Sequence, residues 1–179
     1  GAGGCNTACG TFPAAYTMVN MQGARWQYIN DWTCVGGYAS SSVSDTANRS
    51  FSEANLYLYP ALDNSHGGTL GVAMGLNGET PGRVTTGDCN NANTLDFKGN
   101  ANAYGGGDNM DSYGFAWVFS PTGSAPRLVI GSDDGNRLWV NGVLRNDNNS
   151  TRTLTRDQDQ PAAVGLPAGL SRVLFKVHN

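Results

Sequence analysis

The fold is decided by residues 130–142, which read Ile130-Gly131-Ser132-Asp133-Asp134-Gly135-Asn136-Arg137-Leu138-Trp139-Val140-Asn141-Gly142. Short apolar strands are predicted on both sides of the acidic loop, over residues 127–130 and 137–140. The second strand ends at Asn-Gly, the dipeptide that most strongly indicates a two-residue hairpin turn. The two adjacent carboxylates repel one another unless a cation, ligand hydroxyls or backbone N–H groups of the turn offset the repulsion. The sequence leaves these three possibilities open.

Further strands are predicted on either side of this hairpin. Residues 114–119 and 172–177 alternate large apolar and other side chains, which is typical of half-buried strands. Residues 25–35 are rich in aromatics and predict a strand with a kink near Asn30, whereas residues 100–111 are polar and glycine-rich and predict a surface loop. The predicted core consists of Phe115, Trp117, Phe119, Leu128, Ile130, Leu138, Val140, Val173, Phe175 and Val177. Together these segments predict an all-β protein, an antiparallel jelly-roll β-sandwich.

Length and composition agree with a single β-rich domain. The chain has 179 residues, of which 25 are glycine and 14% are charged, and its net charge is −3. Residues 1–24 show no sustained period and predict an extended arm or linker remnant, so the sandwich is expected over residues 25–179. The basic residues are scattered singly, which argues against nucleic acid as a partner. No apolar run reaches membrane-spanning length, so no membrane partner is expected.

The four cysteines predict disulfide bonds. Their spacings resemble neither a zinc ribbon nor a redox motif. The favoured pairing joins Cys5 to Cys9 in a small loop and Cys34 to Cys89 across two distant loops. The alternative, in which Cys5 and Cys9 each pair with a distant cysteine, stays open. Either pairing indicates an oxidising compartment and hence a secreted, extracellular protein.

Three segments carry a resemblance to a known family. They are residues 131–142, residues 151–159 (Thr-Arg-Thr-Leu-Thr-Arg-Asp-Gln-Asp) and residues 166–177 (Leu-Pro-Ala-Gly-Leu-Ser-Arg-Val-Leu-Phe-Lys-Val). They resemble bacterial β-sandwich modules that are appended to secreted polysaccharide-degrading enzymes and are related in pattern to the lectin-like anthrax-protective-antigen domain. The resemblance implies a non-catalytic module that binds a polysaccharide or oligosaccharide beside neighbouring domains of a larger secreted protein. In sugar-binding relatives, an Asp-Asp pair joined by a cis peptide holds Ca²⁺, and Asp133-Asp134 matches that pair.

Two sets of candidate site residues follow. The expected Ca²⁺ ligands are Asp133, Asp134, Asn109 and Asp111, because carboxylate and amide oxygens suit this cation. The expected sugar-binding residues are Trp139 and Tyr104, which would stack on a pyranose, and Asp133, Asp134, Asn136 and Asp159, which would bind its hydroxyls. Simpler interpretations remain open at each position: the acidic pair shapes a turn, the other acids are solvated, and the tryptophans are core residues.

Catalysis finds little support in the sequence. The chain has no Gly-x-Ser-x-Gly, no His-Glu-x-x-His and no phosphate-binding loop. Asp133 and Asp134 are too close in sequence to flank a glycosidic bond from opposite sides. The expected function is therefore non-catalytic binding assisted by calcium. The alternatives are a structural or protein-docking module of a secreted enzyme, and a small polysaccharide lyase or hydrolase.

Overall fold

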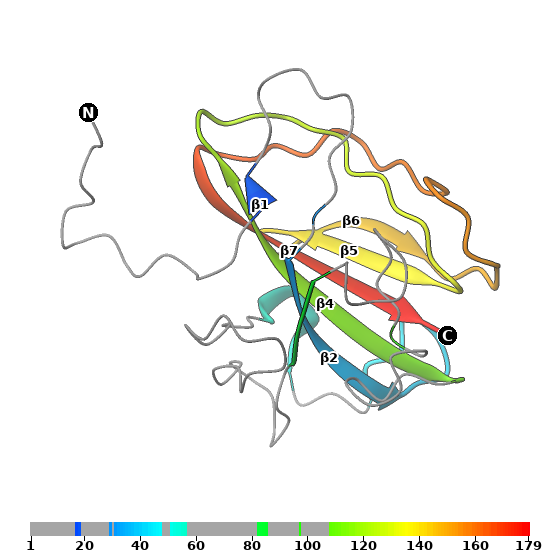
Figure 1. Ribbon diagram of the computed structural model, residues 1–179. Coiled ribbons are helices and arrows are strands. Elements are labelled where there is room, and N and C mark those ends of the chain that lie inside the picture. Colours follow the sequence, from blue (N-terminus) through cyan, green and yellow to red (C-terminus); the bar gives the residue numbers. More distant parts are fainter. Residues whose placement is uncertain are drawn as a thin grey trace.

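The computed structural model describes residues 17–18, 29, 31–47, 51–56, 82–85, 97 and 108–179. Within these ranges the chain forms one sheet with the strand order β3-β2-β4-β7-β5-β6, and β1 pairs with β4 beside this path (Figure 1). All pairings are antiparallel except that of β1 with β4. The elements are β1 (Thr17–Met18), β2 (Asp31–Ala39), the 3-10 turn η1 (Glu53–Asn55), β3 (Gly82–Thr85), β4 (Met110–Ser120), β5 (Asn136–Val140), β6 (Val143–Asn148) and β7 (Gly169–His178). The all-β prediction is confirmed.

Strands β4 and β7 form the centre of the sheet. They pair without interruption from Asp111↔His178 to Ser120↔Gly169 (Figure 1). Almost every residue of β4 is buried, including those between the aromatic positions. The strand is therefore covered on both faces, whereas its alternating pattern predicted a strand with only one buried face.

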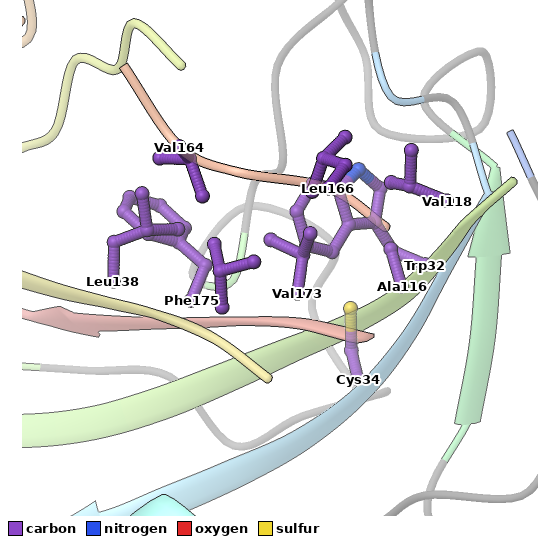
Figure 2. Packing of buried hydrophobic residues seen from close by; sticks show 10 residues of the cluster. Trp32, Cys34, Ala116, Val118, Leu138, Val164, Leu166, Val173 and Phe175 are labelled. Carbon is purple, nitrogen blue, oxygen red and sulfur yellow. The ribbon is translucent and has the colours of Figure 1, made fainter. Parts of the chain in front are cut away.

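The first face of the sheet carries a core that irregular segments cover. Val164 and Leu166, from the segment before β7, lie over Leu138, Val173 and Phe175 of the strands (Figure 2). The covering segments pair with each other only at two isolated bridges, Ser124↔Leu166 and Ile130↔Asp159. The prediction of a strand over residues 127–130 is therefore wrong, because this segment forms only one isolated bridge, at Ile130. Leu128 and Ile130 nevertheless pack against this core.

The second face carries a separate core beneath residues 51–56. Its buried members are Val35, Tyr38, Leu56, Tyr113, Phe115, Trp117, Trp139 and Leu174. The predicted core is consequently divided between the two faces. Ala116 pairs with Val173 and Gly114 with Phe175, and directly opposed residues share a face. Phe115 and Trp117 must therefore point away from Val173 and Phe175.

Two other predictions concern the first half of the chain. Thr17 and Met18, which were placed in the extended arm, form β1 and pair with Val118 and Phe119. Cys34 is buried in the first core. Cys5, Cys9 and Cys89 lie outside the described residues, so the disulfide pairing stays a prediction.

Candidate functional site at the acidic turn

The acidic turn lies at the end of the sheet where β7 finishes and β5 begins. The peptide bond between Asp133 and Asp134 is cis. The N–H of Asp134 donates to the carbonyl of His178 at 2.9 Å, and the N–H of His178 donates to the carbonyl of Gly135 at 2.9 Å. The Ser132 hydroxyl donates to the Asp134 carbonyl at 2.7 Å. The turn is therefore held against β7 by two backbone hydrogen bonds, one at Asp134 and one at Gly135.

The two carboxylates have different surroundings. Oδ1 of Asp134 accepts a hydrogen bond from the N–H of Arg152 at 2.7 Å. Its second oxygen, Oδ2, accepts no hydrogen bond from the described part of the chain. Asp133 is exposed and makes neither a hydrogen bond nor an ion pair with any residue that the structure describes. One acid thus helps to form the turn, and the other presents its whole carboxylate to solvent.

A polar network centred on Asp159 supports the turn. The carboxylate of Asp159 forms an ion pair with Arg152, with 2.6 Å between Oδ2 and Nη2. It also accepts hydrogen bonds from Asn136 at 2.7 Å and from Asn148 at 2.9 Å. Hydrogen bonds from Arg152 lower the pKa of Asp159 most, and those from Asn136 and Asn148 lower it further, to about 2, although burial opposes the shift. The same ion pair raises the pKa of Arg152.

A polar cleft of about 270 Å³ opens beside the turn. Its walls offer hydroxyl, amide, carboxylate and imidazole groups, and no aromatic ring other than that of a histidine. The lining residues are Ser41, Ser42, Asn109, Asp134, Gly135, Asn149, Ser150, Thr151, His178 and Asn179. The segments that meet here come from both ends of the described sequence, which explains why no single motif predicted the cleft.

The structure brings together some of the predicted site residues but not all of them. Asn109 and Asp134 line the same cleft, whereas Asp133, which precedes Asp134 in the turn, is not among its lining residues. Asp159 folds onto the turn, but it and the buried Asn136 are occupied within the network behind the cleft. Asp157, two residues before Asp159, has a φ of 57° and pairs with Arg156.

Other predicted site residues lie elsewhere. Asp111 belongs to β4 rather than to a surface loop, and it is fully buried between Lys176 and His178. Tyr113, also in β4, is buried as well. Trp139 packs in the second core, so its expected exposure is wrong because both faces of β5 are covered. Tyr104 lies outside the described residues. Among the residues that are described, no group of three or more His, Cys, Asp or Glu side chains could hold a metal ion.

Sequence reasoning missed a buried ionic cluster on the second face. Nζ of Lys176 lies 2.6 Å from Oε1 of Glu53 and 2.9 Å from Oδ2 of Asp111. His178 approaches the other oxygen of Asp111 at 2.9 Å, and the Tyr113 hydroxyl donates to Glu53 at 2.6 Å. The alternation of β7 puts Lys176 and His178 on one face, but the acids that receive them come from distant segments.

No helix in the described ranges is long and apolar enough to cross a membrane. Comparison of the chain with protein-family models, curated proteins and solved structures finds no match in any of the three.

Proposed function

We propose that this chain is a non-catalytic, extracellular carbohydrate-binding module of a larger secreted protein, and that its complete fold is a jelly-roll sandwich. The observation that carries the proposal is the polar cleft beside the acidic turn. Serine, threonine and asparagine side chains dominate its walls, and such groups exchange hydrogen bonds with sugar hydroxyls. The motif resemblance of residues 131–142 supports the same function.

Calcium is the cofactor that the acidic turn fits best. The oxygens without a protein partner among the described residues belong to Asp133 and to Oδ2 of Asp134, and Asn109 adds an amide oxygen within the same cleft. Hard oxygen donors suit Ca²⁺, which takes about six to eight of them. The protein would supply fewer than this number, so hydroxyls of the sugar would complete the shell. The cation would also neutralise the repulsion between the two acids.

Rigid support favours binding at this turn over a purely architectural role. The Asp159–Arg152 ion pair and two backbone hydrogen bonds to His178 hold the turn in place before any ligand arrives. A prepared site loses less conformational entropy on binding than a flexible loop does. Asp133 makes no hydrogen bond or ion pair with a described residue, so its exposed carboxylate is available to an external partner.

The double variant Asp133→Asn and Asp134→Asn tests whether the acidic turn binds calcium and sugar. Asparagine keeps the capacity to form the turn but removes both charges. We expect loss of the calcium-dependent rise in stability, which should be about 2.7 kcal/mol for the unaltered chain at a hundredfold excess of calcium over its Kd. Binding to a glycan array should fall to the level that chelator produces. Thermal unfolding and array binding, each with and without chelator, provide the measurements.

Asp157→Asn is the matched control, since it removes a surface carboxylate from the same region outside the cleft. It should leave both calcium stabilisation and glycan binding unchanged. If calcium produces no heat in calorimetry and the double variant binds glycans normally, the turn is architectural and glycan binding lies elsewhere on the chain. If neither the unaltered chain nor the variant binds any glycan, the docking-module alternative gains support. Release of products from acidic or neutral polysaccharides would instead establish the enzyme alternative.

A further inference from the structure

A second pocket lies on the second face of the sheet, between Thr46, residues 51–54 and the β5–β6 hairpin. Its volume is about 320 Å³. It shares no lining residue with the polar cleft and differs from it in combining aromatic, aliphatic and charged groups. The lining residues are Thr46, Phe51, Ser52, Glu53, Ala54, Arg137, Trp139 and Leu144.

The pocket contains a carboxylate oxygen that the described residues leave without a donor. The Glu53 side chain is only 7% exposed. Its Oε1 receives the Tyr113 hydroxyl and Lys176, each at 2.6 Å. Its Oε2 has only Nη1 of Arg137 nearby, at 3.7 Å, which is too long for a hydrogen bond. Oε2 is not among the fully buried unpartnered atoms of the described residues, so it can accept a hydrogen bond from a donor that enters the pocket.

Arg137 supplies the complementary group. Its Nε and Nη2 both donate to the carboxylate of Asp147, each at 2.9 Å, and this contact raises the pKa of Arg137. These two hydrogen bonds fix the orientation of the Arg137 guanidinium group. Its Nη1 faces Glu53 and has no hydrogen-bond acceptor among the described residues. An acceptor on Glu53 and donors on Arg137 thus stand side by side in one wall.

The rest of the wall is largely apolar, with the hydroxyl side chains of Thr46 and Ser52 beside the apolar groups. Trp139 and Phe51 belong to the second core or pack against it, while Leu144 is 44% exposed at the edge of the sheet. A flat surface with hydrogen-bonding groups at its margin is suited to a pyranose ring, whose C–H face is apolar and whose rim carries hydroxyls. Glu53 and Asp147 together balance the charges of Arg137 and Lys176, so the pocket offers no net positive charge to an acidic sugar.

We propose that this pocket is a second carbohydrate site, which binds a neutral pyranose without any metal ion. One hydroxyl donates to Oε2 of Glu53, its neighbour accepts from Nη1 of Arg137, and the ring packs on Leu144 and Phe51. The inference rests on the proposed function for the class of ligand, but it uses different residues and a different mode of recognition. Two sites on one module increase avidity for a polymer that can reach both.

The test is titration of the whole chain with uncharged cello-, xylo- and mannohexaose, in calcium and in chelator, while tryptophan fluorescence is recorded. We expect at least one of these sugars to bind in chelator and to alter the emission of Trp139. Leu144→Ala should weaken this binding about tenfold, and Arg137→Gln should weaken it at least as much. Leu154→Ala is the matched control, because Leu154 is 45% exposed and outside the pocket.

The outcomes separate the two proposals. If the Asp133→Asn and Asp134→Asn double variant abolishes all glycan binding while Leu144→Ala and Arg137→Gln bind normally, the second site is wrong and the calcium site stands. If binding survives both chelator and the double variant but falls in Leu144→Ala and Arg137→Gln, the second site stands alone. If none of the three sugars binds in chelator, the metal-free site is overturned. Leu144 is an exposed edge residue, so its truncation leaves the fold intact.

Discussion

At the scale of single residues, Asp159 is the clearest case of a side chain whose surroundings determine its chemistry. In sequence it is one of several acids in a polar stretch, and a solvated side chain is the first interpretation. In the structure Arg152, Asn136 and Asn148 all donate to it. Such a network needs residues from three segments at once, so the sequence pattern could only indicate the turn that the network supports.

The stability of the protein should therefore fall in acid as Asp159 takes up a proton. Its pKa is about 2 in the folded chain against an ordinary value of 3.8, so the ionised form favours folding. The stabilisation, about 2 kcal/mol, should be complete above roughly pH 4 and disappear between about pH 4 and pH 2. Urea unfolding across this pH range, compared with that of Asp159→Asn, measures it.

Asp159→Asn should itself destabilise the chain by about 2–3 kcal/mol at pH 7, because Arg152 loses its ionic partner in a partly buried position. The pH dependence between about pH 4 and pH 2 should become weaker in this variant. Asp157→Asn breaks an exposed pair instead and should change the stability by less than about 1 kcal/mol. Equal effects of the two substitutions would contradict the role assigned to Asp159.

At the scale of elements, the sequence predicted the existence of strands better than their environment. Alternation and the Asn-Gly turn located β4, β5 and β7, because these signals are local. The faces could not be assigned, since burial of both faces depends on segments that are distant in sequence. Trp139 was expected to face solvent because its neighbours Leu138 and Val140 face the first core, yet residues 51–56 cover the other side.

Lys176 is a polar residue whose burial the local sequence also could not predict. Its position between Phe175 and Val177 on β7 is typical of a solvent-facing lysine, but the structure buries it completely between two acids. We expect Lys176→Met to destabilise the protein by about 3–5 kcal/mol, because Glu53 and Asp111 would remain buried without the ammonium group that contacts both of them. Chemical unfolding at pH 7 provides the measurement.

Adding Glu53→Gln and Asp111→Asn to Lys176→Met should restore part of the lost stability, since it removes the charges left behind. A Lys176→Met variant as stable as the unaltered chain would mean that the cluster contributes nothing to folding. A triple variant less stable than Lys176→Met alone would show that hydrogen bonds to the acids, rather than their charges, are important.

At the scale of the whole molecule, one sheet carries two cores. Val173 and Leu174 are neighbours in β7, yet the first belongs to the core of one face and the second to the core of the other. Because the same strands support both cores, loss of packing on one face should be transmitted to the other. The two cores should therefore unfold as one cooperative unit.

Val173→Ala and Leu174→Ala test this cooperativity. We expect both variants to be destabilised, Leu174→Ala by about 2–5 kcal/mol, and both to unfold in a single transition. Far-ultraviolet circular dichroism, which follows the sheet, and tryptophan fluorescence, to which Trp32 of the first core and Trp117 and Trp139 of the second contribute, should give coincident curves. Curves that separate in Val173→Ala would indicate that the two faces unfold independently.

The position of β7 also has a consequence for how the polypeptide leaves the ribosome. This strand lies between β4 and β5, although both precede it in the chain. Until residues 169–178 have been synthesised, the β5–β6 hairpin has no neighbour on its inner side, and β4 lacks its longest partner. Contacts between segments so far apart in sequence slow folding. The β2–β4 part and the β5–β6 part of the sheet can therefore join only after β7 has been synthesised.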